Sequence, residues 1–182
     1  WLIANNTFPS GYIGIGARHG PLDANRVQIY GYGKMMVLDP GYEKPKYTKN
    51  HNTILINGNG QLGEGGSWFD AATVIREQAS SKIIKAYTSD NFDYIIGDGS
   101  KVYPKTTGLE KFYRHFIYIK PDIIIVVDEL KASKPALFES LISTETRDIE
   151  TINQNYHIFK NGDVYMDVYI LLPETINTEV VD

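Results

Sequence analysis

The sequence contains no cysteine among its 182 residues, which excludes disulfide bonds, thiolate zinc sites and cysteine nucleophiles. Any transition metal would therefore be held by histidine and carboxylate side chains. No run of about 18 apolar residues is present, so we expect no transmembrane helix and no membrane partner. The net charge is −4 and no basic run occurs, which argues against nucleic acid as a partner.

Several catalytic motifs are also missing from the chain. It has no G-x-S-x-G, Walker, Rossmann or H-E-x-x-H pattern, so serine hydrolysis, nucleotide binding and one class of zinc proteolysis lose their usual support. Helical periodicity is almost absent. The best helical window, Ala71–Ser80, carries three β-branched residues, and we predict a strand there instead.

Short apolar segments rich in Val, Ile, Thr, Tyr and Phe, bounded by Gly, Pro, Asn and Asp, are typical of strands and turns. The predicted strands are Tyr12–Ala17, Arg26–Tyr32, Lys34–Leu38, Thr53–Ile56, Thr73–Ser80, Ile83–Thr88, Phe92–Gly97, Phe112–Lys120, Ile123–Asp128, Leu137–Ser143, Tyr156–Lys160 and Val164–Leu172. Asn161-Gly162 and Pro121-Asp122 predict two hairpins. The pattern predicts an all-β fold, an antiparallel two-layer β-sandwich, with residues 1–182 as one domain.

Three polar clusters meet the ends of predicted strands in the first third of the chain. His19 and Asn25 precede one strand, Asp39 follows the next, and His51 precedes a strand that ends in an Asn-Gly turn. An aspartate and a histidine at adjacent strand ends can share one metal ion. The clusters predict a site at this part of the molecule.

The order H-x-x-x-D-x-N, strand, L-D-P-G-Y and H-N-T-I-L-I-N-G-N-G-Q resembles the C-terminal β-sandwich domain of the heparinase II/III-like polysaccharide lyases, which include heparin/heparan sulfate lyases and oligoalginate lyases. The segment 51–61 is the specific part, and the resemblance covers roughly residues 12–173. It implies a secreted or periplasmic bacterial protein. It also implies a larger parent, in which an N-terminal α-helical toroid domain, absent from this chain, supplies much of the substrate groove. Both chain ends look like cuts from such a parent.

The resemblance further implies a zinc site. In the family an H-x-H motif, the Asp of the D-P-G turn and the His of H-N-T hold the ion, which matches Asp39 and His51 here. His19 matches the first histidine of H-x-H, but Pro21 stands where the second is expected and offers no ligand. His19 or a water would then complete the zinc site. Alternatively, Asp39 accepts turn amides and His51 donates to a backbone carbonyl.

Catalytic and substrate-binding residues follow from the same resemblance. His19 matches a family histidine that assists in the cleft, and Tyr42 or Tyr47 matches a tyrosine that protonates the leaving oxygen or binds sugar. A solvated loop histidine and sheet-packing tyrosines are the alternatives. The residues that could bind sugar are Asn25, Gln61 and Trp68. Asn25 and Gln61 equally fit a turn or supporting role, and Trp68 fits a core anchor; His115 and His157 are expected to be structural.

The resemblance implies β-elimination on a uronic-acid polysaccharide, with this chain as one wall of the cleft and inactive alone. An acidic polysaccharide or oligosaccharide and the toroid domain are then its partners. The alternative is a non-catalytic sandwich domain that binds carbohydrate or supports another domain and has a degenerate metal site. Pro21 favours this alternative, and the residues that precede Trp1 would distinguish the two.

Overall fold

The computed structural model describes residues 2–5, 24–38, 47–65 and 80–181, and more than half of them lie in strands. The strands are β1 (Leu2–Asn5), β2 (Arg26–Gly31), β3 (Lys34–Val37), β4 (Ile54–Ile56), β5 (Ser80–Thr88), β6 (Phe92–Lys101), β7 (Leu109–Ile119), β8 (Ile123–Ala132), β9 (Phe138–Ser140), β10 (Ile149–Asn153), β11 (Tyr156–Asn161) and β12 (Val164–Tyr169). Two single 3₁₀ turns, η3 (Thr48–Asn50) and η4 (Lys105–Thr107), are the helical elements of the described ranges. None of these is long and apolar enough to span a membrane.

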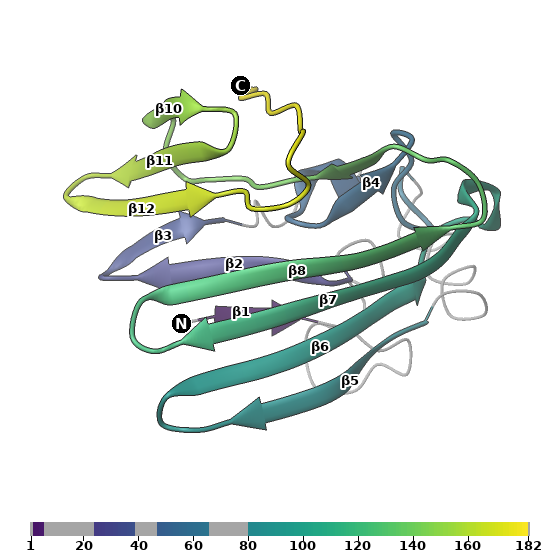
Figure 1. Ribbon diagram of the computed structural model, residues 1–182, viewed down its shortest axis with the longest axis horizontal. Coiled ribbons are helices and arrows are strands. Elements are labelled where there is room, and N and C mark those ends of the chain that lie inside the picture. The colour runs from purple at the N-terminus through teal and green to yellow at the C-terminus, as the bar shows by residue number, and fades with distance from the viewer. Residues whose placement is uncertain (1, 6–23, 39–46, 66–79, 182) are drawn as a thin grey trace.

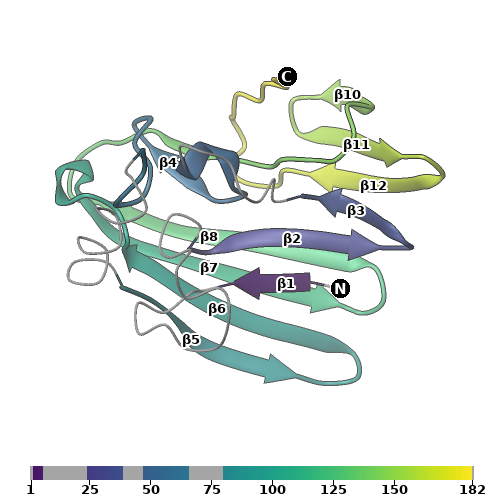
Figure 2. The ribbon, with the colours of Figure 1, turned by 180° about the vertical axis from the view of Figure 1, so that it is seen from behind.

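The strands form four antiparallel sheets. The largest has the order β5-β6-β7-β8 and crosses the front of Figure 1. A three-stranded sheet, β1-β2-β3, lies behind it, as the reverse view in Figure 2 shows. The pair β4-β9 and the sheet β10-β11-β12 complete the set.

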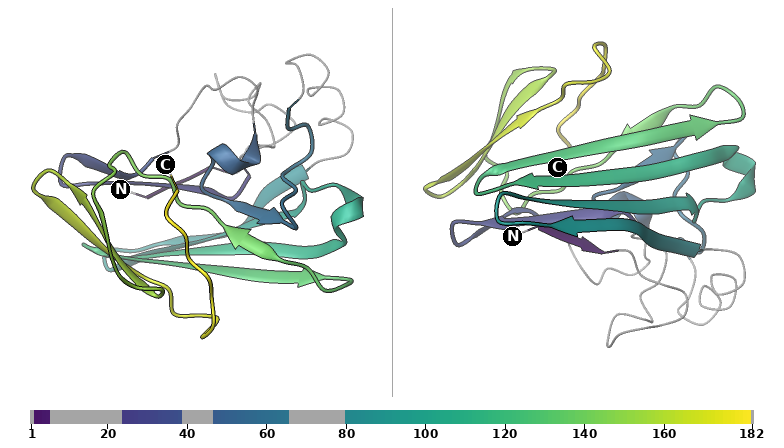
Figure 3. Two further views of the ribbon diagram at one scale, coloured as in Figure 1. Left: turned by 90° about the horizontal axis from the view of Figure 1, so that it is seen from above. Right: turned by 60° about the horizontal axis from the view of Figure 1, so that its bottom comes forward.

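Two layers enclose the hydrophobic core, and they are seen on edge in the left view of Figure 3. Val27 and Val37 of the rear sheet pack with Phe116 of β7 in one cluster. Ile54 and Ile56 of β4 pack with Phe112 of β7 and neighbouring residues in a second cluster. The molecule therefore has an all-β, sandwich-like fold, as the sequence predicts.

Strand β7 shows how the sequence creates the two layers. Successive side chains of a strand point to opposite faces, so Phe112, Arg114 and Phe116 turn inward while Tyr113 and His115 turn outward. The turn at residues 120–122 returns the chain into β8, which pairs with β7 along nearly its whole length. The predicted hairpin at Pro121-Asp122 is confirmed.

The hairpin at Asn161-Gly162 is also confirmed, since β11 and β12 pair directly across it. Gly162 has a φ of 66°, a conformation that glycine adopts without a Cβ penalty. The sequence missed β10, and the predicted strand Leu137–Ser143 contains only the three residues of β9. The predicted strand Tyr12–Ala17 lies outside the described residues, as does Thr73–Ser80 except for Ser80.

Candidate functional site

The segment from η3 to Glu64 forms a hydrogen-bonded frame at one end of the sandwich. Its polar members, here called the loop-end frame, are Thr48, Asn52, Thr53, Gln61 and Glu64. The first four are almost completely buried. Buried polar groups of this kind are stable only when they are hydrogen-bonded, and each of these side chains is.

Gln61 is bound at both ends of its amide group. Its Oε1 accepts from the Ala24 backbone N–H at 3.1 Å, and its Nε2 donates to the Ala24 carbonyl at 3.0 Å. The Thr53 hydroxyl donates to the same carbonyl at 3.0 Å. The side chain of Gln61 thus substitutes for a strand partner of Ala24. This geometry fits the supporting role that the sequence left open, and sugar binding by Gln61 stays a prediction.

Asn52, the second residue of the H-N-T motif, joins three segments. Its Nδ2 donates to the carbonyl of Val27 at 2.9 Å and to that of Leu38 at 2.7 Å. Its Oδ1 accepts from the backbone N–H of Ser143 at 2.5 Å. One side chain therefore fixes the end of β3, part of β2 and the chain that leaves β9.

Asn25 is buried and has a φ of 61°, in the left-handed region that asparagine tolerates better than most residues. Its Nδ2 donates to the carbonyl of Gly97 on β6 at 3.1 Å. Its own carbonyl accepts from Arg114 Nη1 at 2.7 Å. These contacts fit the alternative role of Asn25 as a turn residue, and sugar binding by Asn25 stays a prediction.

A buried ion pair that the sequence analysis did not identify lies beneath the frame. Arg114 of β7 is 2% exposed and donates through Nε and Nη2 to the two carboxylate oxygens of Asp128 on β8, each at 2.6 Å. Its Nη1 also donates to the carbonyl of Asn52 at 2.8 Å. A bidentate pair of this kind has a fixed geometry. It ties the front sheet to the loop-end frame.

The signal for this pair is present in the sequence but is long-range. Arg114 sits at an inward position of a strand whose inward neighbours are phenylalanines, and Asp128 lies at an inward position of the next strand. An arginine among buried aromatic residues needs a carboxylate partner. The partner becomes evident only once the register of β7 and β8 is known.

His51 and Tyr47 are the predicted site residues that lie beside the frame. His51 is 7% exposed, and its backbone N–H donates to Thr48 at 3.0 Å, closing η3. Tyr47 is half-buried, and Lys49 Nζ lies 5.4 Å from its ring centroid. A Cβ built on Gly65 would lie 3.4 Å from Tyr47 Cε1, so this ring lies close to the Gly65 backbone.

His19, Asp39, Tyr42 and Trp68 lie outside the described residues. Among the described residues no group of three or more His, Cys, Asp or Glu side chains could hold a metal ion. Of the predicted zinc ligands only His51 is described, and a histidine side chain is a suitable zinc donor. The shared zinc site of Asp39, His51 and His19 therefore stays a prediction.

Each segment that carries one of these four residues has at least one end attached to the loop-end frame. Segment 6–23 ends at Ala24, which binds Gln61, and segment 39–46 begins after Leu38, whose carbonyl binds Asn52. Tyr47 precedes Thr48, and Gly65 follows Glu64, whose carboxylate accepts from Thr48 N–H and Gly60 N–H, each at 3.1 Å. Four segment ends thus attach to one frame, and this is the candidate functional end of the molecule.

No model of a known protein family matches the sequence, and no curated protein matches it either.

Proposed function

We propose that this chain is the β-sandwich part of a polysaccharide lyase, and that its loop end forms one wall of the cleft for a uronic-acid polysaccharide. The observation that carries the proposal is the loop-end frame. Three of its five members, Asn52, Thr53 and Gln61, come from the H-N-T-I-L-I-N-G-N-G-Q segment that resembles the lyases, and its contacts are to the ends of the segments that carry His19, Asp39 and Tyr42. The motif thus acts as a scaffold for the residues that face substrate.

The proposed chemistry is β-elimination. A base removes the proton at C5 of the uronic acid, an acid protonates the glycosidic oxygen, and the C4–O bond breaks as a C4=C5 double bond forms. Neutralising the substrate carboxylate raises the acidity of the C5 proton. Tyr47 or Tyr42 would protonate the leaving oxygen and His19 would assist. The zinc predicted at Asp39 and His51, with His19 or a water, would position the loops that carry these residues.

The test is the activity of the complete gene product on alginate, heparan sulfate and polygalacturonate. Each elimination leaves an unsaturated uronate whose conjugated double bond absorbs ultraviolet light, so cleavage is followed by absorbance. We expect cleavage of one of the three, and Tyr47→Phe should reduce kcat by about 100-fold or more if Tyr47 is the acid. Tyr165→Phe, on the opposite end of the sheet system, should leave kcat unchanged. Absence of unsaturated products from all three polymers would contradict the lyase.

A non-catalytic carbohydrate-binding or structural sandwich is the second candidate. Two observations favour it. Pro21 replaces an expected metal ligand, and the polar groups of Asn25 and Gln61 are engaged by the protein itself. Binding of one of the three polymers without any unsaturated product would support this candidate over the lyase.

A further inference from the structure

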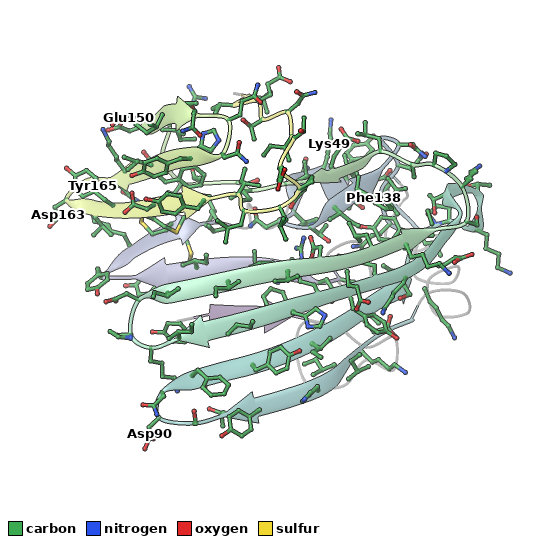
Figure 4. The ribbon with its side chains drawn as sticks, viewed as in Figure 1. Lys49, Asp90, Phe138, Glu150, Asp163 and Tyr165 are labelled. Carbon is green, nitrogen blue, oxygen red and sulfur yellow. The ribbon has the colours of Figure 1, made fainter. Side chains whose placement is uncertain are left out.

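The outward face of the sheet β5-β6-β7-β8 carries a second cluster of chemically distinctive side chains. The opposite, inward face of this sheet packs on the core through Ile95, Phe112 and Phe116. No described strand covers the outward face, which is turned to the viewer in Figures 1 and 4. The side chains that alternate with the core residues therefore reach solvent.

A row of polar and aromatic side chains runs diagonally across this face. The Tyr94 hydroxyl on β6 lies 2.8 Å from His115 Nδ1 on β7, and the two rings stack at a centroid distance of 6.0 Å. His115 Nε2 lies 3.8 Å from a carboxylate oxygen of Glu129 on β8. Diagonal neighbours on a sheet are within reach of such long side chains. The row thus fixes the position and tilt of the Tyr94 ring.

Two lysines lie against the tyrosines of this face. Lys85 Nζ is 5.4 Å from the Tyr94 ring centroid, and Lys111 Nζ is 4.6 Å from that of Tyr113. Lys111 also pairs with Glu129. The structure shows no ion pair from Lys85 to a carboxylate of the described residues. Its charge is therefore available to the anionic group of a ligand whose apolar face lies on the Tyr94 ring.

Exposed apolar groups continue the surface on the β5 side. Tyr87 is 51% exposed and lies next to Phe92, with ring centroids 5.2 Å apart. A partly exposed ring with a lysine beside it, Tyr94 with Lys85, next to the exposed rings of Tyr87 and Phe92, suits a ligand that is apolar on one side and carries an anionic group. A pyranose ring with a carboxylate has this character, because its C–H face stacks on aromatic rings while its carboxylate accepts from an ammonium group.

We propose that this outward face, here called the outer platform, binds a chain of uronic acid residues through Tyr94, with Lys85 pairing a sugar carboxylate and Tyr87 and Phe92 extending the stacking surface. The choice of a uronic acid rests on the proposed function, whereas the geometry of ring and cation does not. The outer platform lies on a different surface from the loop-end frame. It would hold the polymer without cleaving it.

The test is isothermal titration calorimetry of the chain with a hexamer of 1,4-linked mannuronate, with cellohexaose as the neutral counterpart. Tyr94→Ala should weaken mannuronate binding about tenfold through loss of stacking, and Lys85→Gln should weaken it several-fold. Tyr94→Phe keeps the ring, and its affinity for mannuronate should be within about threefold of that of the unchanged chain. Tyr165→Ala is the matched control, since Tyr165 is an exposed tyrosine on β12, outside this sheet (Figure 4). Far-ultraviolet circular dichroism establishes that each variant is folded.

The outcomes separate the two proposals. Absence of binding by the unchanged chain, or equal affinities in Tyr94→Ala, Lys85→Gln and Tyr165→Ala, would overturn the outer platform. Tyr47→Phe is titrated in the same way, and loss of mannuronate binding in this variant alone would overturn the outer platform in favour of a site at the loop-end frame. If the unchanged chain binds no sugar but self-associates, and Tyr94→Ala abolishes this self-association, a second copy of the chain covers the face instead. If Tyr94→Ala weakens mannuronate binding but the complete gene product cleaves none of the polymers, the outer platform is supported and the lyase activity is contradicted.

Discussion

At the scale of the single residue, burial decides what each polar group contributes. Arg114 is enclosed by Phe112, Asp128 and two backbone carbonyls, and removing the Asp128 carboxylate would leave its charge without a counter-charge in the interior. Glu129, the next residue along β8, points to the opposite face and is half exposed in its ion pair with Lys111. Two adjacent carboxylates therefore have very different importance for stability.

Asp128→Asn should accordingly lower the free energy of unfolding by about 3 kcal/mol, because it leaves the buried Arg114 charge unpaired. Glu129→Gln is the matched control and should change it by less than about 1 kcal/mol. Urea denaturation followed by tryptophan fluorescence measures both. Equal losses in the two variants would show that the Arg114–Asp128 pair does not stabilise the fold.

The sequence identifies several residues at the loop-end frame as candidates, but it does not predict their buried hydrogen bonds. Polar clusters at strand ends and the resemblance to the lyases make Asn25, Gln61 and His51 site candidates, and in the structure Gln61 binds Ala24 while the neighbouring Asn25 binds Arg114. The hydrogen bonds from Ala24 to Gln61 and from Arg114 to Asn25 span 37 and 89 residues of sequence. Such contacts depend on the stacking of two sheets, which local patterns do not encode.

At the scale of the element, strands rich in β-branched and aromatic residues were the predictable part. The sequence predicts most of β7 and of β8, the two arms of one hairpin, because β-branched and aromatic residues are frequent in both strands. It missed β10, Ile149–Asn153, in which the two isoleucines are three positions apart and the other residues are acidic or polar. The pairing of β10 with β11 supplies the stabilisation that the local sequence lacks.

The turn from β4 to Glu64 gives a prediction at this scale. A Cβ built on Gly60 would lie 2.0 Å from Glu64 Oε2 and 2.5 Å from Thr48 Cβ, so Gly60→Ala must displace the frame. We expect it to lower the free energy of unfolding by about 1–3 kcal/mol, the usual cost of overpacking. Gly31→Ala is the control, because a Cβ there meets no atom within 4 Å. Thermal unfolding compares the two, and an unchanged melting temperature for Gly60→Ala would contradict the tight frame.

At the scale of the whole molecule, one tyrosine connects the two layers near the frame. Tyr103 lies in the core cluster with Ile54 and Phe112. Its hydroxyl donates to the carbonyl of Ile54 at 2.6 Å and accepts from Gln61 Nε2 at 3.4 Å. Burial raises the pKa of Tyr103 from 10.0 to about 12, because the phenolate would lose its hydration.

The raised pKa makes global stability depend on pH in the alkaline range. Below pH 10 Tyr103 is neutral in both the folded and the unfolded chain, so its full contribution to stability is present. Between pH 10 and about pH 12 only the unfolded chain ionises at this residue, which favours unfolding. The free energy of unfolding should therefore fall by roughly 2 kcal/mol across this window through Tyr103 alone.

Tyr103→Phe isolates that contribution. At pH 7 the variant should be less stable by about 1–3 kcal/mol, because the Ile54 carbonyl loses its donor. Above pH 10 this difference should shrink, since phenylalanine does not ionise and the unchanged chain loses stability by a route that the variant lacks. Tyr165→Phe, which removes an exposed hydroxyl, is the control. The free energy of unfolding is measured by urea denaturation from pH 7 to pH 11.5. If its pH dependence is the same in Tyr103→Phe as in the unchanged chain, Tyr103 ionises as easily in the folded protein as in the unfolded one.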